Sequence, residues 1–139
     1  MPSSRPKRQR VWVTAKTLSS QEKAAIAALC DRFISGVLKP KFLPEIGPTE
    51  FNYPIDILGK WRGDNYSFIV RFRSGFPENK GEEFDSSFTR LDYAPEGTET
   101  RFNVMWRRHT GQWWPIYFSL TLEEALTALE TDGVLRPPV

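Results

Sequence analysis

The most constraining feature of this sequence is an alternation of apolar and polar residues toward its C-terminal end. Over 101–107, phenylalanine, valine and tryptophan occupy every second position, and tryptophan, isoleucine and phenylalanine do the same over 114–118. Between the runs, the four-residue stretch 109–112 (HTGQ) contains a glycine, which hairpin loops use where φ is positive. A period of two places alternate side chains on opposite faces of a sheet, so these runs predict an antiparallel hairpin.

Three earlier segments also read as strands, because aromatic and β-branched residues alternate with polar ones. These segments are 51–57, 66–73 and 88–93. The stretch RGDN at 62–65 predicts a turn, and the polar stretch 74–87 predicts a long loop. Short connections between consecutive strands favour an antiparallel meander of about five strands.

Two capping boxes indicate the starts of two helices. SSQE at 19–22 precedes apolar residues spaced by three and four, which predicts a helix over 20–38. TLEE at 121–124 precedes a second such stripe, which predicts a helix over 121–132. A proline follows the first stripe and disfavours helical geometry for the residue before it, so 39–48 should be an extended connector.

The predicted order of elements gives an α+β fold, an antiparallel meander with an N-terminal and a C-terminal helix packed on one face. A chain of 139 residues can bury one core, so we expect a single domain over 11–139. Residues 1–10 contain prolines and charges but no apolar side chain beyond the initial methionine, and we expect a disordered basic tail there.

The net charge of +2 hides a difference between the tail and the rest. Residues 1–10 hold four basic residues and no acidic one, whereas residues 11–139 hold 15 basic and 17 acidic residues, a net charge of −2. The chain lacks a run of about 18 apolar residues, so no membrane association is expected. Its single cysteine suits a reducing compartment, and we expect a cytoplasmic protein.

Few residues are candidates for catalysis or metal binding. His109 and Cys30 are the only histidine and cysteine, which excludes a zinc site made of three or four such ligands. Cys30 lies near the apolar stripe of the first helix and is expected to be buried. The acidic stretch 78–85 lacks the spacing of an EF-hand, although a weak cation site there stays open. The sequence therefore predicts no catalytic residue, cofactor or metal site; it leaves enzymatic activity open but favours a non-enzymatic binding or interaction domain.

One sheet face is a candidate for binding, because arginines and aromatic residues share it. Its predicted members are Arg71, Arg73, Arg101, Arg107, His109, Trp113 and Tyr117. If solvent-exposed, such a face could stack on bases and contact phosphates, and nucleic-acid binding together with the basic tail is one hypothesis. The alternative is that the arginine stems and aromatic rings only cover the sheet. A protein partner or a homodimer formed through an exposed strand edge is a further hypothesis.

Several short motifs carry a resemblance. They are KPK at 39–41, FNY at 51–53, FTRLDY at 88–93, RHTG-x-W at 108–113 and SLTLEEAL at 119–126. Together they resemble a family of small uncharacterised bacterial proteins over about residues 38–130. The resemblance implies a single-domain cytoplasmic protein of bacterial origin and implies no activity, since the shared positions are hairpin, cap and core signals.

Overall fold

The computed structural model describes residues 17–43, 45 and 47–139, so the tail predicted over 1–10 lies outside the described residues. Its helices are α2 (Ser20–Phe33), α3 (Lys39–Phe42) and α4 (Leu122–Thr131). Its strands are β1 (Tyr53–Arg62), β2 (Asn65–Arg73), β3 (Glu83–Tyr93), β4 (Phe102–Arg107) and β5 (Trp113–Leu120). A π-helical turn (Ile34–Leu38) and two 3-10 turns (Pro77–Asn79 and Gly133–Leu135) complete the described elements.

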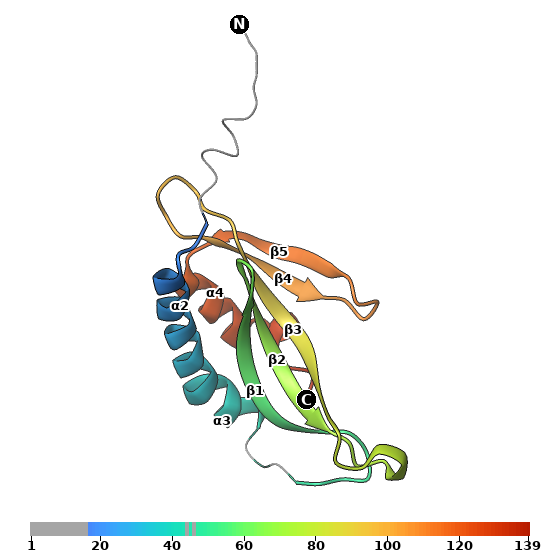
Figure 1. Cartoon of the computed structure of the whole chain (residues 1–139). Helices are drawn as coiled ribbons and strands as arrows, with labels where there is room; N and C mark the ends of the chain where they lie inside the picture. The colour runs from blue at the N-terminus through green and yellow to red at the C-terminus, as the bar shows by residue number, and fades with distance from the viewer. Residues whose placement is uncertain (1–16, 44, 46) are drawn as a thin grey trace, which may run out of the picture.

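The five strands form one sheet in the order β1-β2-β3-β4-β5, and every neighbouring pair is antiparallel. The predicted α+β class and the meander are therefore confirmed, and Figure 1 shows the helical segments before and after the sheet. Both capping boxes form as predicted. Ser19 Oγ accepts a hydrogen bond from the amide of Glu22, and Thr121 Oγ1 accepts one from the amide of Glu124.

The prediction that 39–48 is an extended connector is wrong at its start, because the helix continues through Pro40 to Phe42. Pro40 lies in the first turn of α3, where a missing backbone N–H is tolerated. A π-helical turn comes immediately before it, and the amide of Lys39 there donates to the carbonyl of Ile34, five residues back. The wider turn accommodates the proline without ending the helix.

The predicted loop over 74–87 is also too long, since β3 begins at Glu83 rather than at Phe88. The polar start of β3 lies directly opposite the arginines of β2, with Asp85 facing Arg71 and Glu83 facing Arg73. These cross-strand ion pairs extend the sheet where the apolar alternation has stopped.

The register gives the sheet two faces of different character. The face that we call the core face carries Ile57, Gly59, Trp61, Tyr66, Phe68, Val70, Thr89, Leu91, Phe102, Val104 and Trp106. The face that we call the charged face carries Lys60, Arg62, Ser67, Arg71, Arg73, Glu83, Asp85, Arg90, Asp92, Asn103, Arg107 and Trp113.

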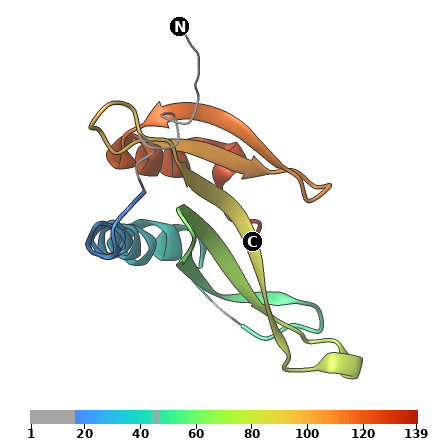
Figure 2. The ribbon, with the colours of Figure 1, turned by 45° about the horizontal axis from the view of Figure 1, so that its top comes forward.

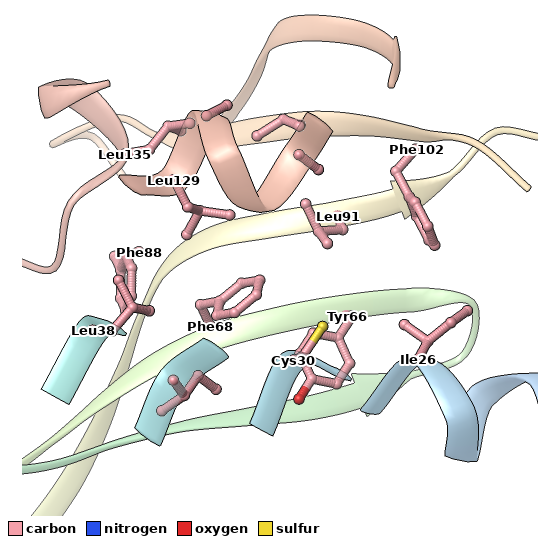
Figure 3. Close-up of a cluster of buried hydrophobic side chains, with 14 of the residues drawn as sticks. Ile26, Cys30, Leu38, Tyr66, Phe68, Phe88, Leu91, Phe102, Leu129 and Leu135 are labelled. Atoms are coloured by element: carbon pink, nitrogen blue, oxygen red, sulfur yellow. The ribbon is translucent and has the colours of Figure 1, made fainter. Parts of the chain in front are cut away.

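The hydrophobic core combines core-face residues with helical ones. Phe68 and Leu91 are fully buried, and Cys30 of α2 and Leu129 of α4 belong to the same cluster (Figure 3). Gly59 is required by this packing, since a Cβ atom there would lie 1.9 Å from Oη of Tyr66. The sequence prediction ended β1 at Ile57, whereas the strand runs through this glycine to Arg62.

The β4–β5 hairpin separates from the remainder of the sheet at one end. β3 pairs with β4 only from Thr89 to Tyr93, whereas its pairing with β2 extends back to Glu83. Figures 1 and 2 show the hairpin running at an angle away from the far ends of β2 and β3. The C-terminal residues approach the sheet beside this separation, where Oγ1 of Thr89 donates a hydrogen bond to the carbonyl of Leu135 at 2.9 Å.

Candidate functional site

Two adjacent hollows lie where the hairpin leaves β3, and we call them together the basic groove. The first, of about 340 Å³, is lined by Ser86, Ser87, Phe88, Trp106, Arg107, Arg108, His109, Gly111, Val134, Arg136 and Pro138. The second, of about 210 Å³, is lined by Arg62, Asn65, Ser67, Ser87, Arg90, Arg107, Gly111 and Trp113. The hollows share Ser87, Arg107 and Gly111, so they adjoin where β4 leaves β3. The second lies on the charged face, whereas the first is lined by the core-face residue Trp106 and by residues near the C-terminus.

Local geometry creates this groove. A register shift in the β2–β3 ladder falls between Phe68 and Ile69, and the β3–β4 ladder starts only at Thr89. Ser87 therefore has no partner on β4, and Nη1 of Arg107 approaches its carbonyl oxygen at 3.4 Å instead. In the β4–β5 loop, Gly111 adopts φ 88° and donates a backbone hydrogen bond to the carbonyl of Arg108. This tight loop places its basic residues beside the end of the ladder.

The electrostatic character of the groove follows from its lining. Five arginines line it, and no aspartate or glutamate is among the described lining residues. Arg90 forms an ion pair with Asp92, with a distance of 2.5 Å between its Nε and Oδ1 of the carboxylate. The other four are Arg62, Arg107, Arg108 and Arg136, and none of them has a carboxylate within 4.0 Å in the part of the chain that the structure describes.

Two guanidinium groups of the groove are held over tryptophan rings. Cζ of Arg90 lies 4.7 Å from the ring centroid of Trp113, and Cζ of Arg108 lies 5.3 Å from that of Trp114. The Nε atom of Arg108 is buried and has no hydrogen-bond partner among the described residues.

The structure places three of the seven predicted face residues in the groove, namely Arg107, His109 and Trp113. Arg71 and Arg73 share the charged face but not the groove. Nε of Arg71 lies 2.9 Å from Oδ1 of Asp85, and hydrogen bonds from this guanidinium lower the pKa of that carboxyl. Arg73 is held in the same way by Glu83, at 2.7 Å.

The other two predicted residues lie elsewhere. Arg101 donates to the carboxylate of Glu99 and, through Nη1 at 2.8 Å, to the carbonyl of Ser119. Tyr117 packs against the core, and its hydroxyl donates to Asp132 at 2.7 Å, which raises the pKa of the tyrosine and lowers that of the aspartate.

The placement of Tyr117 with Trp113 on one face is thus wrong, and a bulge is the reason. In the β4–β5 ladder Met105 faces Pro115 while Val104 faces Tyr117, so Ile116 is an extra residue on β5. One extra residue reverses the faces of the positions that follow it, which turns Tyr117 toward the core, until a second register shift places Leu120 opposite Phe102.

The sequence reasoning missed Arg62, Arg90, Arg108 and Arg136 as groove residues. Arg90 could have been found, since it alternates with the buried Thr89 and Leu91 in a segment already predicted to be a strand. Arg136 could not, because its position depends on where the C-terminal residues pack, and no local pattern encodes that.

Cys30 and the acidic residues Glu83 and Asp85 have structural roles, in core packing and in cross-strand ion pairs. The thiol of Cys30 is fully buried, and burial raises its pKa to about 12. Glu83 and Asp85 are strand residues engaged by arginines, not members of a loop. In the described part of the chain, no three side chains of histidine, cysteine, aspartate or glutamate gather closely enough to hold a metal ion.

The fold and the groove define a small α+β domain with arginine-lined hollows where β4 separates from β3. The chain belongs to DUF3024, a family described as a domain of unknown function, whose model matches residues 18–136. Comparison with curated proteins and with solved structures gave no match. The function is therefore unknown, and the comparisons lend no support to nucleic-acid binding. Among the described residues, no helix is long and apolar enough to cross a membrane.

Proposed function

We propose that this protein is a non-enzymatic binding domain whose basic groove takes a ligand that carries phosphate groups. In this proposal both helices pack on the core face and leave the charged face, where the second hollow lies, open to the ligand. The observation that carries it is the set of four arginines without a nearby carboxylate around two adjoining hollows.

The chemistry of the lining fits phosphate better than it fits an apolar ligand. A guanidinium presents its N–H groups as a planar fork that matches two oxygens of a phosphate. Ser67, Ser87 and Asn65 add neutral donors to the arginines of the second hollow. A concave site lined by charges of one sign also raises the local concentration of oppositely charged ligands. Each of these properties favours an anion with several oxygens.

The groove arginines differ from the other arginines of the charged face in their ion pairing. Arg71 and Arg73 have the same chemistry and lie on the same face, yet each is already bound to a carboxylate. Those carboxylates would repel an incoming anion, so the proposal confines binding to the groove. This contrast supplies a matched control within the chain.

Isothermal titration calorimetry with inorganic triphosphate at low salt tests the proposal. Arg107 lines both hollows, so Arg107→Gln should weaken binding about tenfold or more, as expected for the loss of charge-assisted hydrogen bonds. Arg73→Gln removes the same charge outside the groove and should leave the affinity within about twofold, because exposed, paired charges contribute little. Urea unfolding of both variants shows whether the fold is intact.

Two results would contradict the proposal. One is no heat of binding for the unmodified protein at low salt. The other is an equal loss of affinity in both arginine variants, which would mean that triphosphate responds to overall charge rather than to the groove.

A further inference from the structure

We infer that the ligand of the basic groove is a single-stranded nucleic acid that crosses the charged face in the second hollow and reaches the adjoining first hollow where β4 leaves β3. This inference rests on the proposed function and specifies its ligand. It starts from how the cations are distributed. Arg62 lines only the second hollow, Arg108 and Arg136 line only the first, and Arg107 lies between them in both.

This distribution is too extended for a single phosphate. Arg62 belongs to β1 and Arg107 to β4, and neighbouring strands lie about 4.8 Å apart, so these two positions are separated by roughly 14 Å across the sheet. A ligand that contacts both ends must carry anionic groups at intervals. A nucleic-acid strand has one phosphate per nucleotide and meets that requirement.

The second observation is that each hollow contains aromatic rings as well as cations. Trp113 lines the second hollow and Trp106 lines the first, whereas Phe88 at the first hollow is 5 % exposed and belongs to the core. Arg90 lies over the Trp113 ring and holds it in place at the sheet surface. Proteins that bind single strands combine a basic path for the backbone with aromatic side chains on which bases stack. A polyanion without bases could not stack on these rings, so the rings would not strengthen its binding.

The surroundings of the groove favour one strand over a duplex. Beyond the groove, the charged face carries Glu83, Asp85 and Asp92, each in an ion pair with an arginine. The rigid, broad backbone of a duplex would meet these carboxylates, whereas a single flexible strand can follow the depression. Residues 11–139 also carry a net charge of −2, which disfavours the broad electrostatic attachment that duplex binding uses.

Fluorescence anisotropy with end-labelled oligothymidine and oligouridine tests the inference on the full-length chain. Affinity should rise with length from a dinucleotide to about 12 nucleotides and then level off once both hollows are occupied. The logarithm of the binding constant should fall with the logarithm of salt concentration, with a slope of about −0.7 for each phosphate contacted. Arg107→Gln should reduce that slope by about one such step.

Stacking is tested by Trp113→Leu, which should weaken oligonucleotide binding about fivefold or more while leaving triphosphate binding within about twofold. Phe118→Leu is the matched control, since Phe118 is a 64 % exposed aromatic residue of the same strand outside the groove. That control should bind like the unmodified protein. An equal effect of both variants on oligonucleotide binding would overturn the stacking argument and with it the inference.

The outcomes separate this inference from the proposed function. If triphosphate binds through Arg107 but longer oligonucleotides bind no tighter, the groove takes a compact phosphate ligand and only the inference fails. If a duplex or polyglutamate binds as tightly as the single strand, the inference also fails. If neither triphosphate nor oligonucleotide binds, both proposals fail.

Residues 1–10 provide the remaining test, because their four basic residues could bind nucleic acid without the groove. Glutamine is substituted at the four basic positions in the full-length chain: Arg5, Lys7, Arg8 and Arg10. The inference requires that Arg107→Gln and Trp113→Leu still weaken binding in this background. The inference would be overturned if the fourfold glutamine variant lost all binding while Arg107→Gln and Trp113→Leu had no effect in the unmodified chain.

Discussion

The two faces of the sheet are built from strands of the same hairpins, yet they differ in what their side chains do. On the core face Phe68, Leu91 and Phe102 are completely buried and pack with residues of α2 and α4. On the charged face, Arg71 and Asp85 keep about two-fifths of their side-chain surface exposed. Substitutions on the core face should therefore change stability, and substitutions on the charged face should change binding or very little.

The charged face is itself divided in a way that matters for function. Toward the far ends of β2 and β3, arginines and carboxylates alternate across the strands and neutralise one another. At the groove, where β4 leaves β3, Arg107 has no carboxylate partner among the described residues and lies near a backbone carbonyl instead. The difference indicates that unbalanced charge, rather than the number of arginines, distinguishes a binding surface from an ordinary solvated one.

The largest effect on stability is expected from Phe102→Ala on the core face. Phe102 is fully buried and packs against Tyr93, with a distance of 6.1 Å between the ring centroids. Loss of a buried phenylalanine side chain should lower the free energy of unfolding by about 3–5 kcal/mol. Urea denaturation followed by far-UV circular dichroism measures this. Phe118→Ala, at a 64 % exposed position of the same hairpin, should cost no more than about 0.5 kcal/mol.

Comparable losses for Phe102→Ala and Phe118→Ala would contradict the assignment of the two faces. Comparing these two variants tests the bulge directly, because the extra residue Ile116 determines which face of the sheet Phe118 occupies. A strict alternation without the bulge would have placed Phe118 on the same face as Phe102.

A smaller loss is expected from Gly59→Ala, also on the core face. A methyl group at this position would lie 1.9 Å from Oη and 2.4 Å from Cζ of Tyr66, a ring that is itself buried. The ring must shift in a packed core, which should cost about 1–3 kcal/mol of unfolding free energy. The control is Gly36→Ala, at a helical position with nothing within 4 Å of the added atom, which should be neutral or stabilising. A neutral Gly59→Ala would show that this packing is looser than described.

Much of the fold could be predicted from local patterns. The alternation over 102–106 and the two capping boxes correspond to β4 and to the starts of α2 and α4. These signals work because each depends on residues within one turn of helix or one strand. One error occurred where a partner on another strand changes the outcome, since Arg71 and Arg73 extend β3 back to Glu83. The other errors, at Pro40 and at Ile116, come from local departures from regular geometry.

The candidate site was less predictable for the same reasons. Arg107 and Trp113 face each other across one hairpin, so their proximity follows from the loop between them. Arg62 is the last residue of β1 and Arg136 follows the last 3-10 turn, and they line the two hollows only because the sheet order and the C-terminal path bring them there. A one-residue bulge removed Tyr117 from the predicted face, and no composition signal at Ile116 announces it.

The smallest effect is expected from Asp85→Asn on the charged face, and it should depend on pH. Hydrogen bonds from Arg71 lower the pKa of Asp85 in the folded protein below the unfolded value of about 3.9. The ion pair therefore stabilises the fold above about pH 4, and this contribution is lost as the pH falls through the lowered folded pKa. At pH 7 the substitution should cost at most about 1 kcal/mol, as is usual for exposed pairs.

The measurement is urea unfolding of the unmodified protein and of Asp85→Asn at pH 7 and at successively lower pH. The two proteins should differ at neutral pH and converge only as the pH falls through the lowered folded pKa of Asp85, because the carboxylate is then protonated in both its folded and unfolded forms. Glu78→Gln serves as control, since Glu78 is exposed and has no ion pair among the described residues. A difference that persists unchanged at low pH would mean that Asp85 acts through packing or hydrogen bonding rather than charge. The ion pair between Arg71 and Asp85 would then contribute no charge-dependent stability, and its contrast with the groove arginines would lose its electrostatic basis.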